Sequence, residues 1–184
     1  MDRALYIIEN NKYSVSDLDR LKERLMDLGC PHGIRISITH IEVVVFCKDS
    51  KIIRDKITKA LGSRIIDVFI GEPEVKEGKE LSNFIDFLDN ELFWLAHTFM
   101  ETPWKNHNDK RLQSLVLYAG ALAKAQENEL KASLNLLNMA KDFGAEELID
   151  LNCAKKQIDL ILKNKRTNAS SCLNLEKIRE LLRN

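Results

Sequence analysis

The spacing of apolar residues changes near residue 75, and this change constrains the fold more than any other feature. Before it, short apolar runs alternate with amphipathic segments of helical period, whereas no segment from Lys79 onward has a period of two. Period two is typical of strands and a period near 3.6 of helices. We therefore predict an α+β protein with two domains, an α/β domain over residues 1–75 and an all-α helical bundle over residues 79–184.

Four strands and two helices are expected in the first domain. The predicted strands are Ala4–Ile8, Ile34–Thr39, Ile41–Cys47 and Arg64–Ile70. The predicted helices run from Ser14 or Ser16 to Gly29, and over Ser50–Leu61. Gly71, Pro73 and Gly78 then punctuate a charged linker. The order βαββαβ indicates a ferredoxin-like, or split-βαβ, sandwich with its first and third strands central.

One face of this sheet should pack on the two helices, and the other face is unusually apolar. On the predicted alternation that second face carries Val44, Phe46 and Phe69 beside Arg35, Glu42 and Asp67. An apolar surface of this kind requires cover, so we expect the C-terminal half or a second subunit to bury it, with a ligand surface as the alternative. RNA stacking is not favoured, because residues 1–76 hold 13 basic against 12 acidic residues.

Helices are expected throughout the second domain. A first short stripe is formed by Leu81, Phe84, Ile85 and Leu88, and longer helices follow at Leu92–Thr102, Leu112–Gln126, Glu129–Phe143, Ala145–Lys163 and Leu175–Leu182. Pro103 should end or kink the second helix, and the polar run Lys105–Lys110 should form a loop with Asp109 as a helix cap. Small residues around Gly120 should let two helices approach closely.

The segment Leu92–Trp104 is the best candidate for a site. His97 and Glu101 stand four apart in an otherwise apolar run, with Trp104 three further on, so the three line one edge of a helix. A carboxylate and an imidazole beside aromatic rings need a partner, a metal or a ligand. We expect this edge to face the space between helices, with Gln113 within its reach.

The run F-W-L-A-H-T-F-M-E-T-P-W, with R-L-Q-S-L-V-L-Y-A-G-A-L after it, resembles a helical family known as domain of unknown function 309. The family motif is approximately F-[FWY]-E-A-H-E-x-x-E-x-x-W, followed by a helix that opens near x-x-Q-G-L. His97, Glu101, Trp104 and Gln113 stand on its His, third Glu, Trp and Gln. The resemblance covers about residues 79–143. It implies a helical fold with a polar edge, and no activity.

This chain departs from the motif at two carboxylates. Leu95 and Thr98 replace the two Glu residues that flank Ala-His in the family, and Pro103 precedes the Trp. His97 and Glu101 remain as two possible metal ligands, where a first-row metal normally takes three or four. The other histidines (His32, His40, His107) lie in predicted turns or loops. We therefore expect a buried hydrogen-bonded pair here, with metal binding and proton transfer as alternatives.

Composition limits which partners, cellular location and cofactors are expected. The chain has 28 basic and 28 acidic residues, so its charge alone calls for no nucleic-acid or lipid partner. No apolar run approaches the length of a membrane span, and the N-terminus does not resemble a signal peptide. The four cysteines are widely spaced, which predicts reduced thiols and a cytoplasmic protein. No cofactor is expected, since every glycine is isolated.

These observations favour a non-enzymatic binding or regulatory module that self-associates or binds a protein partner through the sheet. One alternative is a small metal-dependent or hydrolase-like enzyme that uses His97 and Glu101. A second is an RNA-associated protein that uses the basic C-terminal helices, where residues 153–184 hold eight basic against three acidic residues.

Overall fold

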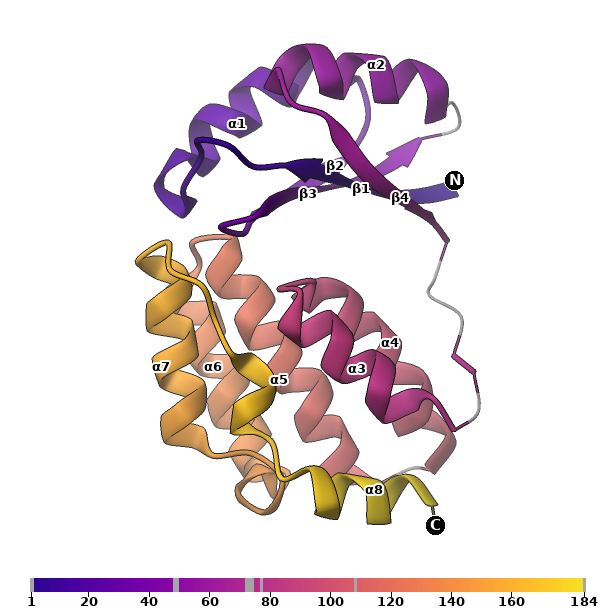
Figure 1. Ribbon diagram of the computed structural model, residues 1–184, viewed down its shortest axis with the longest axis vertical. Coiled ribbons are helices and arrows are strands. Elements are labelled where there is room, and N and C mark those ends of the chain that lie inside the picture. The colour runs from indigo at the N-terminus through magenta and orange to yellow at the C-terminus, as the bar shows by residue number, and fades with distance from the viewer. Residues whose placement is uncertain (1, 48–49, 72–74, 77, 108, 184) are drawn as a thin grey trace. The chain divides into compact units, whose positions relative to one another are not determined.

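The computed structural model describes residues 2–47, 50–71, 75–76, 78–107 and 109–183 (Figure 1). The chain divides into two compact units, Met1–Glu72 with Gln126–Asn128, and Pro73–Ala125 with Glu129–Asn184. The first unit contains an antiparallel sheet and the second is helical, which confirms the predicted α+β class. Pro73, which is predicted to interrupt the linker, lies outside the described residues.

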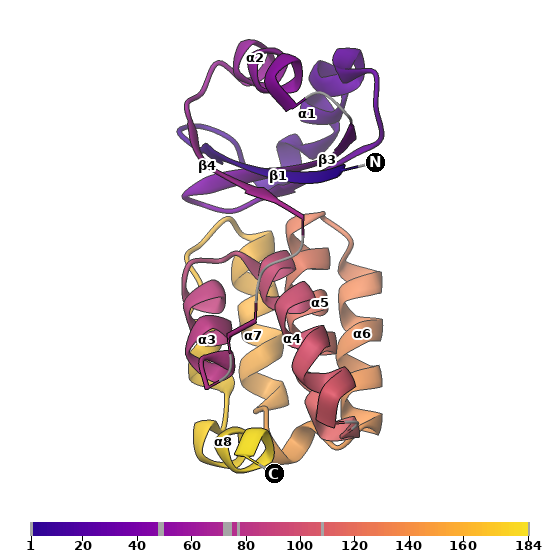
Figure 2. The same ribbon diagram turned by 90° about the vertical axis from the view of Figure 1, so that its right-hand side faces the viewer.

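The first unit is a four-stranded sheet with two helices on one face (Figure 2). Its elements are β1 (Asp2–Glu9), α1 (Leu18–Leu25), β2 (His32–Ile36), β3 (His40–Cys47), α2 (Ser50–Leu61) and β4 (Ile65–Ile70). The strand order is β2-β3-β1-β4 with antiparallel pairing throughout, so the first and third strands are central, as the βαββαβ pattern predicts.

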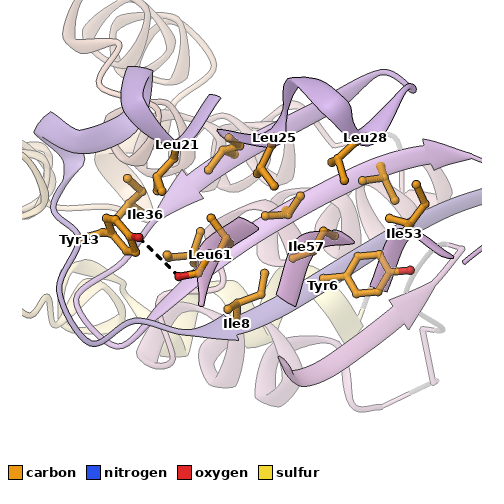
Figure 3. Packing of buried hydrophobic residues seen from close by; sticks show 14 of the residues in the cluster. Tyr6, Ile8, Tyr13, Leu21, Leu25, Leu28, Ile36, Ile53, Ile57 and Leu61 are labelled. Atoms are coloured by element: carbon orange, nitrogen blue, oxygen red, sulfur yellow. Dashed lines mark hydrogen bonds between the residues drawn. The ribbon is translucent and has the colours of Figure 1, made fainter. Parts of the chain in front are cut away.

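The core of this unit lies between the sheet and its helices (Figure 3). Tyr6 and Ile8 of β1 project into it because alternate residues of a strand share a face. Leu21 and Leu25 of α1 meet them at i, i+4 spacing, and Ile57 of α2 completes the layer. All five side chains are almost fully buried.

The predicted strand Ile34–Thr39 is wrong at both ends, because β2 spans His32–Ile36. The chain turns over the three residues that follow. The Ser37 N–H donates to the His40 carbonyl (2.9 Å), and the Asn10 amide donates to the Ser37 carbonyl (2.6 Å). A side-chain hydrogen bond from Asn10, 27 residues away, thus takes the place of strand pairing at Ser37, and no local pattern predicts it.

The second unit contains six α-helices and two short 3-10 helices within its described residues. They are α3 (Glu80–Asp89), α4 (Phe93–His107), α5 (Lys110–Gln126), α6 (Leu130–Asp142), η3 (Ala145–Glu147), α7 (Leu151–Leu162), η4 (Ala169–Cys172) and α8 (Leu175–Arg183). Phe93, Phe99 and Tyr118 are fully buried between them, and Ala119 and Ala121 let the backbone of α5 approach its neighbours. No helix of the described part of the chain could cross a membrane.

Pro103 should end or kink its helix, and the predicted end is wrong, since α4 continues to His107. Proline lacks the N–H that would bond the carbonyl four residues earlier, at Phe99. The Pro103 ring is buried within the helical unit. The first three residues of the predicted Lys105–Lys110 loop are helical.

The single helix predicted over Ala145–Lys163 is also wrong. The chain forms η3, extends at Ile149, and restarts as α7 at Leu151. Asp150 causes the restart, because its carboxylate accepts from the N–H groups of Asn152 (2.9 Å) and Cys153 (3.0 Å).

The prediction of reduced thiols is wrong as well. Cys153 and Cys172 are joined by a disulfide across 19 residues of sequence, and Cys30 is also disulfide-bonded. Their separation along the chain hides the pairing, because the α7–η4 connection folds back to bring the two residues together.

Candidate functional site

The polar edge lies on α4. The helix buries Phe93, Ala96 and Phe99 at spacings of three. Beside these, His97, Glu101 and Lys105 follow one another at intervals of four, on a line that is partly open to solvent. The buried stripe therefore orients the polar line, because rotation of the helix would expose the aromatic side chains.

His97 is held at both ring nitrogens. Its Nδ1 lies 2.9 Å from the carbonyl oxygen of Val116 on α5, so Nδ1 carries a proton and donates to that oxygen. Its Nε2 lies 3.3 Å from Glu101 Oε1. A carboxylate also only accepts, so a ring protonated on both nitrogens satisfies both partners, whereas a neutral ring satisfies Val116 alone.

Two further groups fix the plane of the imidazole. The Trp94 ring stacks on it, with 5.1 Å between ring centroids and an interplanar angle of 24°. Gly120 of α5 lies against the ring, where a Cβ atom would be only 3.1 Å from Nδ1. The bond to the Val116 carbonyl therefore depends on a residue without a side chain at position 120.

Glu101 is bound from both sides, yet it is only half-buried. Its Oε1 faces His97, and its Oε2 accepts from Lys105 Nζ at 2.8 Å. The side chains of His97 and Glu101 are 21% and 35% exposed. The pair thus lies at the rim of the α4–α5 contact, nearer to solvent than the predicted interior position.

Trp104 and Gln113 are not joined to this pair by any hydrogen bond that the described residues form. Both side chains are half-buried. Trp104 stands seven residues after His97 on α4, and Gln113 stands three residues before Val116 on α5, so each lies one or two turns along the same edge. Their part in a site remains a prediction.

A metal would find only two protein ligands at this edge. Among the residues that the structure describes, no three His, Cys, Asp or Glu side chains are grouped so that they could hold a metal ion. His97 Nδ1 faces a carbonyl at hydrogen-bond distance, which leaves Nε2 and the Glu101 carboxylate as the available donor atoms. Any ion there would need ligands from water or from another molecule.

The sequence pattern does not predict the buried carboxylate of Glu91, at the turn between α3 and α4. Its Oε1 accepts from the N–H (2.8 Å) and from the hydroxyl (3.0 Å) of Thr167. Glu91 also has a positive φ of 58°, which the hydrogen bonds help to hold. The two residues are 76 positions apart, so no local spacing could have indicated the contact.

The sheet face opposite α1 and α2 is the second candidate surface, and the strand register defines it. Leu5 of β1 pairs with Val44 of β3 and with Phe69 of β4, and Ile7 pairs with Glu42 and Asp67. The face also carries Phe46, Arg35 and His40. Arg35 Nη1 lies 3.6 Å from Glu42 Oε2, and His40 Nε2 lies 3.7 Å from Glu42 Oε1.

Residues 81–136 match the model of a family described as Domain of unknown function (DUF309). This confirms the resemblance that the α4 motif predicts. The matched segment is less than a third of the chain and, apart from Gln126–Asn128, lies in the helical unit, so the sheet is outside it. No curated protein and no solved structure gives a significant match to the chain.

Proposed function

We propose that the protein is a non-enzymatic binding or regulatory module that self-associates through the sheet face opposite α1 and α2. One observation carries this proposal, namely that five apolar side chains share that face (Leu5, Ile7, Val44, Phe46 and Phe69), of which Phe46 is 39% exposed and Phe69 is half-buried, while the other three are buried. Helices α1 and α2 both cover the other face of the sheet. Accessible aromatic side chains are typical of protein–protein interfaces.

The apolar side chains of the face suit a second copy of the chain as the partner. A twofold interface uses the same patch on both subunits, so the patch must complement itself, and apolar side chains meet this condition. The buried charges of the face do not contribute, because Arg35 already pairs within the chain with Glu42 at 3.6 Å and with Glu127 at 2.7 Å.

The arrangement of the α4 edge supports a structural role for His97 and Glu101. Both nitrogens of His97 and both carboxylate oxygens of Glu101 already face groups of the same chain. A proton-transfer or metal-dependent enzyme would use these same atoms. Elemental analysis decides between the roles, because zinc, iron or manganese at one ion per chain, lost in Glu101→Ala, would favour the enzyme.

Sedimentation equilibrium of the full-length protein at micromolar concentrations tests self-association. We expect a dimer whose Kd rises at least tenfold in Phe69→Glu, since loss of a central apolar contact costs on the order of 1–3 kcal/mol. Met26→Glu is the matched control, because Met26 is 72% exposed in the 3-10 helix that follows α1, away from this face. A wild-type protein that stays monomeric at every concentration would overturn the proposal.

The same proposal makes protein rather than nucleic acid the partner. The zero formal net charge supports this choice of partner, as does the pairing of Lys163 in the basic C-terminal segment with Asp159 at 2.7 Å. The cytoplasmic location loses its argument from reduced thiols, because Cys153 and Cys172 form a disulfide. Titration with single-stranded RNA tests the rival role. Binding that weakens steeply with added salt would favour an RNA-associated protein.

A further inference from the structure

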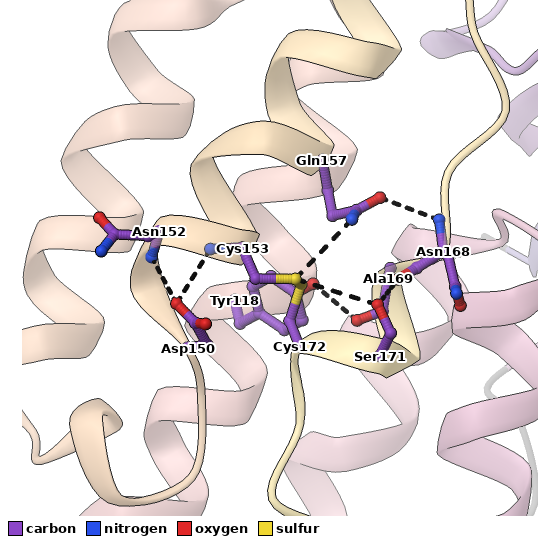
Figure 4. Close-up of a disulfide and its surroundings, with 9 residues drawn as sticks. All are labelled: Tyr118, Asp150, Asn152, Cys153, Gln157, Asn168, Ala169, Ser171 and Cys172. Carbon is purple, nitrogen blue, oxygen red and sulfur yellow. Dashed lines mark hydrogen bonds between the residues drawn. A yellow bond between two sulfur atoms is a disulfide. The ribbon is translucent and has the colours of Figure 1, made fainter.

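We propose that the Cys153–Cys172 disulfide keeps the C-terminal helix α8 docked and that reduction of the bond releases this helix. The bond joins the first turn of α7 to η4 (Figure 4). Only Leu173 and Asn174 separate Cys172 from the start of α8. Any interaction that fixes the position of Cys172 therefore also fixes the position of the start of α8.

The connection to α8 is tied to the chain before α7 by backbone hydrogen bonds. The Asp150 N–H donates to the Cys172 carbonyl, and the Asn174 N–H donates to the Leu148 carbonyl, both at 2.8 Å. Between them, Ile149 and Leu173 form an isolated antiparallel bridge. This two-sided contact is too short to persist by itself, because an isolated pair of strands is marginally stable in water even when longer. The covalent bond lies directly beside it.

Side chains hold the other end of η4. The Tyr118 hydroxyl donates to the Ala169 carbonyl at 2.9 Å, and the Asn168 N–H donates to Gln157 Oε1 at 2.9 Å (Figure 4). These bonds do not involve sulfur and remain after reduction. Loss of the disulfide should therefore loosen the chain after Cys172 more than the chain before it.

Helix α8 depends on its attachment for stability. It has nine residues, fewer than the 12–15 or so that an isolated helix needs in water. Ile178 is its fully buried side chain, while Leu181 and Leu182 are half-buried. Because so little apolar surface anchors it, α8 has two accessible states, docked and released, and the disulfide favours the docked one.

Reduction of the bond is ordinary thiol–disulfide exchange with a dithiol. A reductant thiolate attacks Cys153 Sγ, the more accessible sulfur, since Cys153 is half-buried and Cys172 is 3% exposed. A mixed disulfide forms at Cys153, and Cys172 leaves as a thiolate that water protonates. The second thiol of the reductant then releases Cys153 and becomes a disulfide itself. Cys153 is the third residue of α7, where the helix N-terminus favours its thiolate and the Asp150 carboxylate opposes it.

Hydrogen exchange of the full-length protein, oxidised and then reduced with dithiothreitol, tests whether the disulfide keeps α8 docked. We expect amides of α8 to exchange roughly tenfold faster or more after reduction, on the scale of losing a cross-link, with α4 and α5 unchanged. Trypsin should then cut first at Lys177 and Arg179. Cys153→Ser should behave like the reduced protein without any reductant.

Cys30→Ser is the matched control, because it removes a cysteine of the first unit that is also disulfide-bonded. In this variant α8 should still respond to dithiothreitol as in the wild type. Three results would overturn the proposal. The first is equal exchange at α8 in the oxidised and reduced proteins, and the second is faster exchange throughout the helical unit. A thiol titration that finds Cys153 and Cys172 free under oxidising conditions would also overturn it.

Discussion

At the scale of single residues, His97 is constrained by three different contacts. It contacts a backbone carbonyl of α5, a carboxylate on its own helix and the Trp94 ring. A partly buried imidazole stacked on an aromatic ring is stable only if its polar atoms keep partners. The geometry therefore predicts that substitutions beside the imidazole ring, as at Gly120, lower stability more than substitution of its partly exposed partner Glu101.

Gly120→Ala should destabilise the protein by about 1–3 kcal/mol, because the new methyl group would meet the imidazole of His97. Alanine favours a helix over glycine by roughly 1 kcal/mol, so a position without this clash would be stabilised instead. The control is the same substitution in a His97→Ala background, where it should be neutral or stabilising. Urea unfolding of the four proteins measures the coupling, and identical effects in both backgrounds would contradict the assigned contact.

Glu101→Ala should have a smaller effect than the sequence suggests. Removal of a fully buried partner of His97 would lower the free energy of unfolding by about 1–3 kcal/mol. Because Glu101 is 35% exposed and its partner Lys105 is 62% exposed, we expect a loss of only about 0.5–1 kcal/mol. His97→Ala should cost more, since it leaves the Val116 carbonyl without its donor. Equal losses in chemical denaturation would refute this order.

Asp109 should make stability depend on pH below the neutral range. The Arg111 guanidinium binds its two oxygens at 2.8 and 3.1 Å, and this hydrogen bonding holds the pKa of the carboxyl below its usual value, against the effect of burial. A lowered pKa stabilises the fold at any pH above the unfolded value near 3.9, and the gain is lost as pH falls through the folded value. The difference in unfolding free energy between wild type and Asp109→Asn should therefore shrink on acidification below about pH 4. A constant difference would contradict this role.

At the scale of helices and strands, the spacing of apolar residues predicts most elements. It fails where a single polar contact determines the local structure. A short apolar run identifies the strand that carries Tyr6 and Ile8, and four-residue spacing identifies the His97–Glu101 edge. The turn at Ser37 and the break before Asp150 depend on individual hydrogen bonds that compete with regular structure. Contacts between distant residues, such as Glu91 with Thr167 and Cys153 with Cys172, leave no periodic trace in the sequence.

Pro103→Ala should stabilise α4 by about 1–3 kcal/mol, because it restores an N–H to the interior of a helix where proline costs about 3 kcal/mol. The gain should fall short of the full penalty, since the buried ring is lost and the unfolded chain gains freedom. Thr102→Ala is the control, at an exposed neighbouring position of the same helix. Thermal unfolding compares the variants. A lower Tm in Pro103→Ala would show that packing of the ring outweighs the missing hydrogen bond.

At the scale of the whole molecule, the sheet unit has a hydrophobic cluster between its sheet and its two helices. The sheet-side core draws only on residues between Ala4 and Val68, while Phe84, Phe99 and Tyr118 belong to the helical unit. Domains with their own cores can unfold independently. A destabilising substitution in the core of one unit should therefore leave the stability of the other unit unchanged.

Leu21→Ala should destabilise the sheet unit selectively. Leu21 is fully buried in the sheet-side core, so its truncation should cost about 2–5 kcal/mol. In hydrogen exchange followed by mass spectrometry, amides of β1 and β3 should then exchange faster, while those of α4 and α5 keep their wild-type rates. Phe99→Ala is the reciprocal variant, since Phe99 is buried in the helical unit and packs edge-to-face on Phe87 with ring centroids 5.5 Å apart. It should reverse the pattern. If either variant accelerates exchange in both units to the same extent, the chain unfolds as one cooperative system, and the division into two independent units is wrong.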